Sequence, residues 1–226
     1  MPIVLITGAN RGIGLEFARS FAADGWTVHA CCRQPDKAAA LKALAGDVAV
    51  HRLDVTDGLQ VAGLARELAD RPIDLLLNNA GIYGPRTGFG ETDYDEWAPV
   101  FRVNTMAPLR MAERFVAQVA RSERRLIANV SSRMGSIGDN SRGGSYIYRS
   151  SKAALNMVVK SLSADLAGRG IAVVAFHPGW VQTDMGGPEA AITAAESVAG
   201  MRAVMERLGP ADNGKFFDYD GSEIPW

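Results

Sequence analysis

The sequence predicts an α/β protein with one domain, built on a doubly wound parallel sheet that has helices on both faces. Three observations support this prediction. Short, continuously apolar runs recur along the 226 residues, as in strands that are covered on both faces. Amphipathic, helix-like segments alternate with those runs. No repeat or linker divides the chain, so residues 1–226 are predicted to form a single domain.

The candidate strands are runs of β-branched and other apolar residues that end at turn signals. They are Ile3–Ile6, Thr27–Cys32, Val48–Leu53, Ile73–Leu77, Arg125–Val130, Ile171–Phe176 and Lys215–Asp218. The candidate helices between them carry apolar residues at intervals of three and four. They are predicted over residues 13–22, 61–68, 94–103, 106–121, 148–166 and 190–208. Asn104 falls between two of these helices, where a bend could free a backbone carbonyl for a water molecule.

The composition is that of an ordinary globular protein, with 47% hydrophobic and 22% charged residues and a net charge of −1. Its basic residues are scattered, which argues against a nucleic acid or an anionic membrane as partner. No apolar run approaches the ~18 residues of a membrane span, and the first residues do not resemble a signal peptide. We therefore expect a cytoplasmic protein.

The cysteines and histidines predict no disulfide and no metal site. Cys31 and Cys32 are adjacent within an apolar run and are interpreted as buried thiols in a reducing compartment. His29, His51 and His177 are far apart in the sequence, and none has a cysteine or carboxylate at the spacing of a metal ligand.

A glycine-rich turn, TGANRGIG at Thr7–Gly14, ends the first predicted strand, and a helical pattern begins at once. This order presents backbone N–H groups at a helix N-terminus to a phosphate. Gly8, Gly12 and Gly14 would allow a tight turn, close approach of a pyrophosphate and packing of the helix on the strand. The alternative is a turn that binds no ligand, which the position directly after the first strand disfavours.

The fourth predicted strand ends in a second motif, NNAG at Asn78–Gly81. An asparagine at a strand end can tie neighbouring strands together, and we expect this structural role for Asn78. The Ala-Gly pair leaves room for a flat ligand. Asn79, Ala80 and Gly81 are therefore expected to contact a cofactor at the carboxyl end of the sheet.

The choice of cofactor is predicted from the end of the second strand, where an acidic residue often binds the 2′-hydroxyl of the adenosine ribose. Here the strand ends in Cys32, and Arg33 follows. A carboxylate would repel a 2′-phosphate, whereas the guanidinium groups of Arg33 and Arg11 can clamp one. The sequence thus favours NADP(H) over NAD(H), the alternative being that both arginines are solvated surface residues.

The stretch Ser131–Lys152 contains the candidate catalytic groups. Tyr148 and Lys152 are four residues apart on a predicted helix and share one face. Free tyrosine and lysine ionise near pH ~10 and ~10.4, and a neighbouring cation favours the phenolate, so Lys152 is expected to lower the pKa of Tyr148. A serine hydroxyl from the strand end would hold the substrate oxygen. The spacing also occurs by chance on many solvated helices, so its weight comes from the surrounding motifs.

Taken together, the motifs resemble the short-chain dehydrogenase/reductase family. They are TGANRGIG, NNAG, Asn104, Ser-Ser-x-x-Gly, YRSSK and PGWVQT, in the family's order over essentially the whole chain. The tail GKFFDYDGSEIPW and the stretch SSRMGSI are similar to the branch that includes the C-factor signalling protein and sniffer-type carbonyl reductases. The resemblance implies a Rossmann-type fold with a seven-stranded parallel sheet in the order 3-2-1-4-5-6-7. It also implies an NADP-dependent oxidoreductase that acts on carbonyl or secondary-alcohol groups.

The resemblance implies a catalytic role for each of four residues. Ser132 would orient the substrate, because Arg-Met-Gly follows it as in the family's Ser-x-x-Gly. Tyr148 would be the general acid/base, and Lys152 would hold the nicotinamide ribose and lower the pKa of the tyrosine. Asn104 would anchor a proton-relay water.

Around the cofactor, the resemblance implies that Asp54 contacts the adenine and Asn79 the adenosine-side ribose. Within PGWVQT, the residues expected to contact the nicotinamide end are Pro178, Gly179, Val181 and Thr183. The complete expected set is Gly8, Asn10, Arg11, Gly12, Ile13, Gly14, Arg33, Asp54, Val55, Asn79, Ala80, Gly81, Tyr148, Lys152, Pro178, Gly179, Val181 and Thr183.

The chain departs from the family pattern in two ways. The loop between Ser132 and Tyr148 is longer than the family's commonest spacing, and the C-terminal part offers little sequence for a substrate lid. The pocket is expected to be lined by apolar residues of nearby loops: Tyr83, Phe89, Met134, Trp180 and Met185. They favour neutral, apolar or aromatic carbonyls or alcohols. Loop packing is the alternative role, for Trp180 above all, and Arg86, Arg133 and Arg149 would oppose the prediction if they face inward.

The sequence is compatible with two functions. The first is an enzyme that transfers a hydride between NADP(H) and a small carbonyl or alcohol substrate. The alternative is an NAD(P)-binding signalling or regulatory protein of the C-factor type whose turnover is incidental. The intact Asn-Ser-Tyr-Lys set favours the enzyme. Assembly into a homodimer or homotetramer is expected from the resemblance.

Overall fold

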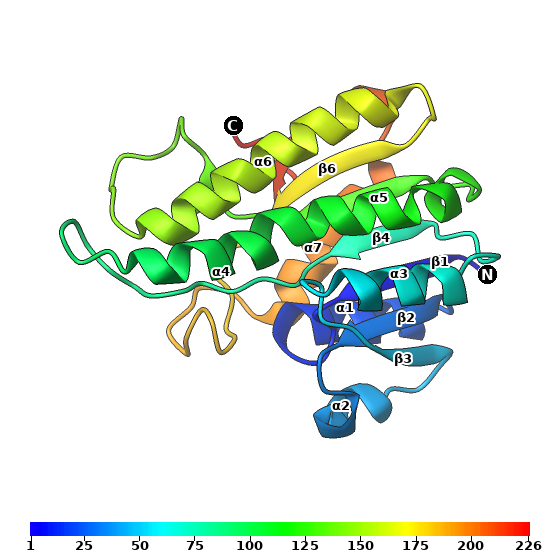
Figure 1. Cartoon of the computed structure of the whole chain (residues 1–226). Coiled ribbons are helices and arrows are strands. Elements are labelled where there is room, and N and C mark those ends of the chain that lie inside the picture. The colour runs from blue at the N-terminus through cyan, green and yellow to red at the C-terminus, as the bar shows by residue number, and fades with distance from the viewer.

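The computed structural model describes all 226 residues, Met1–Trp226. Its strands form one seven-stranded sheet in the order β3-β2-β1-β4-β5-β6-β7, and every neighbouring pair is parallel (Figure 1). The strands are β1 (Ile3–Thr7), β2 (Thr27–Cys32), β3 (Val48–Arg52), β4 (Leu75–Asn78), β5 (Leu126–Val130), β6 (Ala172–His177) and β7 (Phe216–Asp218). The predicted α/β class and strand order are confirmed.

Helices cover both faces of this sheet (Figure 1). They are α1 (Gly12–Ala23), α2 (Ala39–Lys42), α3 (Gly58–Glu67), α4 (Trp97–Phe101), α5 (Ala107–Ala120), α6 (Tyr146–Ala167) and α7 (Ala194–Arg207). The apolar residues of α3, α5 and α6 belong to one buried cluster, and those of α1, α2 and α7 to a second. None of these helices is both long and apolar enough to cross a membrane.

The continuous apolar character of the strands follows from this two-sided cover. Successive side chains of a strand point to opposite faces, so in β1 Ile3 and Leu5 join the first cluster while Val4 and Ile6 join the second. The parallel arrangement also brings the carboxyl ends of all seven strands to one edge of the sheet. The turns that follow the strands therefore gather at that edge.

A few boundaries differ from the sequence-based expectation. β4 begins at Leu75 rather than Ile73, whose N–H donates to the Gln118 carbonyl at 3.1 Å outside the sheet. The last helix begins at Ala194 because Thr193 and Glu196 form a capping box there. The short helix α2 was not expected, since four residues are too few to show a helical period.

The structure brings together two histidines that are distant in the sequence. Nδ1 of His29 on β2 lies 2.9 Å from Nε2 of His51 on β3, and Nδ1 of His51 lies 3.3 Å from a carboxylate oxygen of Glu67 on α3. Burial lowers the pKa of His29 to about 4 and also lowers the pKa of His51, so both rings are neutral at pH 7. The pair thus forms a polar contact between β2, β3 and α3.

Candidate active site

The predicted glycine turn and the NNAG motif meet at the carboxyl edge of the sheet. A Cβ atom added to Gly8 would lie 2.9 Å from Cα of Ala80, and one added to Gly14 would overlap the carbonyl group of Gly8. Gly8 and Gly12 have φ of 66° and 51°, in the left-handed region that glycine adopts readily. The three glycines therefore allow an approach between backbone segments that side chains would block.

The first turn of α1 fits a phosphate group. Its N-cap residue, Arg11, makes no side-chain hydrogen bond to the helix N–H groups, whereas Asp57 caps α3 and Thr193 caps α7. The N–H groups at the start of α1 are thus left for another acceptor, and the helix dipole favours an anion there. Together with the crowded glycines, this uncapped helix end suits a dinucleotide pyrophosphate.

Thr7 and Asn79 join the glycine turn to the end of β4. The Thr7 hydroxyl accepts hydrogen bonds from the backbone N–H groups of Asn79 and Ala80 at 3.0 and 3.1 Å. The Asn79 amide donates to the carbonyls of Thr7 and Gly8 at 3.0 and 3.1 Å. Asn79, expected mainly as a ligand contact, therefore also has a structural role. The expected tie through Asn78 is present, since its amide donates to Asn129 Oδ1 on β5 at 2.9 Å.

The structure places Arg11 and Arg33 differently. Arg11 pairs with Asp184 at 2.7 Å, and both side chains are more than half exposed. Arg33 is exposed just beyond β2 and takes part in none of the ion pairs. Of the two arginines expected to contact a 2′-phosphate, Arg33 is thus the one with no carboxylate partner in this structure. Asp54 makes a local turn, accepting from the Thr56 N–H and hydroxyl at 2.9 and 2.7 Å.

The segment after β6 packs against the glycine turn. A Cβ on Gly12 would lie 3.2 Å from Cγ2 of Thr183, so the two motifs are neighbours. Val181 forms an isolated parallel bridge with Ile192, and Gly179 has a φ of 83° where a Cβ would come within 2.6 Å of the Ile192 side chain. This segment is thus held as a compact loop beside the expected nicotinamide end.

Tyr148 and Lys152 are buried on one face of α6, with exposed fractions of 7% and 4%. Nζ of Lys152 lies 5.9 Å from the centroid of the Tyr148 ring and donates to the Val130 carbonyl at 2.9 Å. A Cβ on Gly81 would lie 3.6 Å from this Nζ, which brings Lys152 to the end of β4 as well. Lys152 is therefore positioned beside the ends of β4 and β5.

The pKa of Tyr148 moves in the opposite direction to the one expected from Lys152. Burial raises the pKa of Tyr148 to about 12, and the nearby Ser132 hydroxyl, a hydrogen-bond donor to the phenolate, opposes that shift. Burial also lowers the pKa of Lys152 to about 8. Loss of solvent around both groups, which a local sequence pattern does not show, is the largest effect on each pKa in this structure.

Asn104 lies in a π-helical turn, Arg102–Met106, between α4 and α5. It is fully buried and exchanges two hydrogen bonds with the backbone of Ile82, at 2.9 and 2.8 Å. Its amide also donates to the Ser151 hydroxyl on α6 at 3.0 Å. Asn104 therefore joins the loop after β4 to the helix that carries Tyr148, and the irregular turn agrees with the bend expected there.

The expected pocket residues divide into two groups. Tyr83 and Met134 lie at the site: the Tyr83 ring stacks on Tyr148 with centroids 4.2 Å apart, and its hydroxyl is 3.6 Å from Met134 Sδ. Phe89 is 91% exposed, and Trp180 is 56% exposed with its indole N–H bonded to the Gly186 carbonyl. The structure therefore favours the loop-packing alternative for Trp180.

Two of the three nearby arginines contact expected pocket residues. Arg86 donates to the Met185 carbonyl at 2.6 Å, and Arg149 donates to the Met134 carbonyl at 3.2 Å. Arg133 instead pairs with Asp218 at 2.6 Å. Arg86 and Arg149 thus bond main-chain carbonyls rather than carboxylates.

Sequence reasoning missed several buried polar residues that support the site. Asn156 accepts from the Ser131 hydroxyl at 2.6 Å and donates to the Gly135 carbonyl at 3.2 Å, which joins α6 to the loop that carries Ser132. Ser151 and Asn156 lie on the buried face of α6, and polar residues on such a face usually have hydrogen-bond partners. Polar residues on the apolar face of a predicted helix are visible in the sequence, and this pattern could have identified Ser151 and Asn156.

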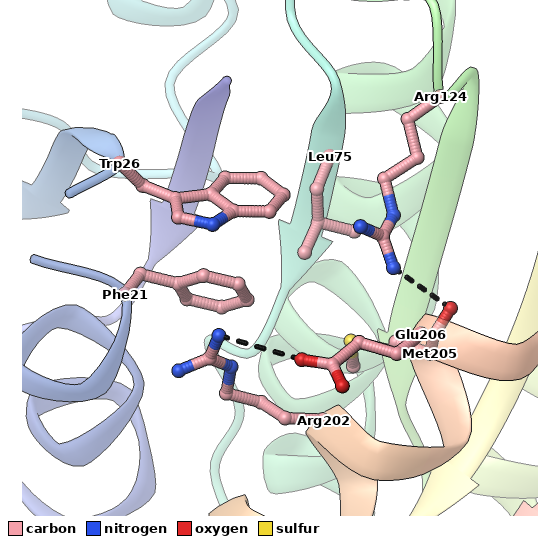
Figure 2. A pocket seen from close by; sticks show the side chains of 7 residues that line it. All are labelled: Phe21, Trp26, Leu75, Arg124, Arg202, Met205 and Glu206. Carbon is pink, nitrogen blue, oxygen red and sulfur yellow. Dashed lines mark hydrogen bonds and ion pairs between the residues drawn. The ribbon is translucent and has the colours of Figure 1, made fainter. Parts of the chain in front are cut away.

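A small pocket lies at the other end of the sheet, between α1, α7 and the start of β4 (Figure 2). The guanidinium carbon of Arg202 is 4.3 Å from the Phe21 ring centroid, and that of Arg124 is 5.6 Å from the Trp26 ring centroid. Arg202 also pairs with Glu206 at 3.7 Å. The space has room for little more than a water molecule, so this cluster packs α7 against the sheet.

Comparison with known proteins agrees with the family resemblance of the sequence motifs. A family model described as short chain dehydrogenase matches residues 2–192. The C-signal protein of Myxococcus xanthus is 47% identical over 162 residues, covering 72% of this chain and 98% of that protein.

The solved structures that match over 100% of both chains include two carbonyl reductases. The carbonyl reductase Sniffer of D. melanogaster has a TM-score of 0.94 at 32% identity. The NADPH-bound carbonyl reductase from chicken fatty liver has a TM-score of 0.90 at 33% identity. By its motifs, its fold and these matches, the chain belongs to the short-chain dehydrogenase family of oxidoreductases, in the branch of C-signal and Sniffer.

Proposed function

We propose that this chain is an NADP(H)-dependent oxidoreductase that transfers a hydride between the nicotinamide and a carbonyl or secondary-alcohol substrate. The observation that carries the proposal is the buried Tyr148 beside the Ser132 hydroxyl, with Lys152 one helical turn further on. A protein that only binds a dinucleotide has no need of such a group. The NADPH-bound carbonyl reductase with the same fold supports the choice of cofactor.

The chain's own residues would control the substrate oxygen and its proton. Bound nicotinamide supplies or accepts the hydride. Ser132 orients the substrate oxygen, and Tyr148 donates a proton to it during reduction. The phenol is protonated at neutral pH and can donate; burial raises its pKa to about 12, which makes it a weaker acid, and the Ser132 hydroxyl opposes that shift. Lys152, with a pKa lowered to about 8, stays mostly charged at pH 7 and stabilises the phenolate that forms.

The proposed substrates are neutral, apolar or aromatic ketones and aldehydes, or the corresponding alcohols. This choice is supported by Tyr83, whose ring stacks on Tyr148, and by Met134, whose sulfur lies 3.6 Å from the Tyr83 hydroxyl. Arg86 and Arg149 lie nearby but donate to backbone carbonyls. Assembly into a homodimer or homotetramer stays a prediction.

A substrate panel with NADPH oxidation as the readout tests this proposal. Neutral aromatic carbonyls are expected to show a higher kcat/KM than carboxylated or phosphorylated carbonyls of matched size. Tyr83 and Met134 offer an apolar surface, and the Arg86 guanidinium is already engaged by the Tyr83 ring and the Met185 carbonyl. A clear preference for the charged compounds would contradict the pocket assignment. Absence of NADPH oxidation across the whole panel would contradict the proposed activity itself.

We expect NADPH to bind more tightly than NADH by at least ~1.4 kcal/mol, a tenfold difference in Kd, because a guanidinium favours a 2′-phosphate. Arg33→Ala should weaken NADPH much more than NADH, as measured by calorimetry. Arg66→Ala, at an exposed arginine of α3, is the control and should change neither. Equal affinity of the wild-type protein for the two cofactors would contradict the prediction, and an equal loss of both in Arg33→Ala would show that Arg33 only supports the loop.

A second function is favoured by the 47% identity to the C-signal protein. In this alternative the chain is a dinucleotide-binding signalling protein and its turnover is incidental. The two functions differ in whether the biological role depends on the Tyr148 hydroxyl, and a single substitution at that residue separates them.

A further inference from the structure

The Tyr83 ring covers one face of the Tyr148 ring. The ring centroids are 4.2 Å apart and the ring planes are inclined by 14°. Tyr83 belongs to the loop after β4, and Tyr148 to the first turn of α6. Because the two rings are nearly parallel and in contact, rotation of the Tyr148 side chain requires Tyr83 to move.

Arg86 packs on the Tyr83 ring, which also stacks on Tyr148. Its guanidinium carbon lies 4.4 Å from the Tyr83 centroid. One guanidinium nitrogen donates to the Met185 carbonyl at 2.6 Å, which anchors Arg86 to the loop after β6. Arg86 takes part in none of the ion pairs in the structure, so no carboxylate neutralises its charge.

The loop after β4 also holds the start of α6. The hydroxyls of Tyr83 and Ser145 lie 3.2 Å apart, and the Ser145 N–H donates to the Thr87 carbonyl at 3.1 Å. Ser145 directly precedes α6 with a φ of 47°, a conformation that is unfavourable for a residue other than glycine. The loop contacts therefore hold a strained residue and, with it, the helical turn that carries Tyr148.

We propose that Tyr83 and Arg86 are positioning residues for Tyr148. The Tyr83 ring holds the plane of the Tyr148 ring, while Arg86 holds Tyr83 in place and favours the ionised form of Tyr148. This inference rests on the proposed function, since it assigns Tyr148 a proton to exchange. It adds Arg86, a cation from outside α6, to the groups that control the ionisation of Tyr148.

The charged, titratable and hydrogen-bonding groups around Tyr148 come from three elements. They are Lys152 and Arg149 of α6, Ser132 at the end of β5, and Tyr83 and Arg86 of the loop after β4. Burial raises the pKa of Tyr148, and the charge of Arg86 lowers it. Removal of that charge should therefore raise the pKa further.

Variants at Arg86 test the electrostatic role. Arg86→Gln removes the charge, Arg86→Lys keeps it, and Arg142→Gln removes a charge from an exposed residue of another loop as the matched control. One readout is the pH dependence of kcat for carbonyl reduction. The other needs no turnover: the ¹³Cζ resonance of Tyr148 is titrated in the free protein and with NADP⁺. Tyr148 is one of five tyrosines, and its resonance is assigned by its absence from Tyr148→Phe.

Loss of the Arg86 charge disfavours the phenolate, so Tyr148 should stay protonated to higher pH. Arg86→Gln is expected to move the alkaline limb of the kcat profile and the ¹³C midpoint upward by roughly half a pH unit. Arg86→Lys should restore most of the shift, and Arg142→Gln should match the wild type. The Kd for NADPH should change little in all three variants.

Variants at Tyr83 test the mechanical role. Tyr83→Leu removes the stacked ring and is expected to lower kcat roughly tenfold while the Kd for NADPH stays within about twofold. Tyr83→Phe keeps the ring and should keep most of the turnover.

The role of Arg86 and the role of Tyr83 are each overturned by a different result. Unchanged midpoints in Arg86→Gln would overturn the role of Arg86, and wild-type kcat in Tyr83→Leu would overturn that of Tyr83. A shifted ¹³C midpoint in a protein that reduces no carbonyl would count against the proposed function and leave the Arg86 role standing.

Discussion

A Tyr148→Phe variant is expected to keep its fold and its affinity for NADPH while losing most of its turnover. General acid–base catalysis typically contributes ~10²–10⁴-fold, and no other side chain described at this position is placed to supply the proton. Phenylalanine retains the buried ring and its stack on Tyr83 but has no hydroxyl. The measurements are kcat with the best carbonyl of the panel and the Kd for NADPH by calorimetry.

The matched control is Tyr146→Phe, the same substitution two residues earlier in α6, where the side chain is 39% exposed. It should turn over at the wild-type rate. If Tyr148→Phe also turned over at that rate, Tyr148 would be excluded from the mechanism. The same variant separates the two candidate functions: an enzyme would lose its biological role, whereas a signalling protein with incidental turnover would keep it.

A Gly14→Ala variant is expected to lose both stability and cofactor binding. The added methyl group would overlap the Gly8 carbonyl and approach Nδ2 of Asn79 to 2.5 Å, so the turn before α1 must move. Overpacking of this kind typically costs about 1–3 kcal/mol of unfolding free energy. The displaced turn would also disturb the uncapped N–H groups proposed to bind phosphate, and we expect the Kd for NADPH to rise at least tenfold. Denaturant unfolding and calorimetry measure the two effects.

Gly63→Ala is the control for this prediction. Gly63 lies within α3, and an added Cβ would meet nothing within 4 Å. Alanine should therefore stabilise the protein by roughly 0.4–1 kcal/mol, because it reduces the freedom of the unfolded chain and favours the helix. Wild-type stability and NADPH affinity in Gly14→Ala would show that the turn has room for a side chain and would contradict the proposed cradle.

Much of the fold could be predicted because its signals are local. A strand buried on both faces must be apolar at every position, so a run such as Ile3–Ile6 is visible without any partner strand. A glycine-rich turn between strand and helix is equally local. The seven-stranded order followed from the resemblance to a family, and the structure confirms it. Boundaries set by distant contacts, such as the start of β4, were less accurate.

The candidate site was predictable where its residues share one helix or one turn. Tyr148 and Lys152 lie four residues apart, so helical geometry alone places them on one face. Their protonation was not predictable in the same way. Burial depends on segments folded over α6 from elsewhere in the chain, and it raises the pKa of Tyr148 to about 12 where the local argument expected a lower value.

The sequence by itself determined the parallel α/β architecture and the edge of the sheet at which the glycine turn, the NNAG motif and the Tyr148–Lys152 pair would gather. The tertiary structure alone decided what surrounds Tyr148. Tyr83 and Arg86 come from a loop far from α6 in the sequence, and no periodicity relates them to Tyr148. The physical reason is that helical and strand periods are properties of neighbouring residues, whereas ring stacking and desolvation depend on which distant segments the fold brings into contact.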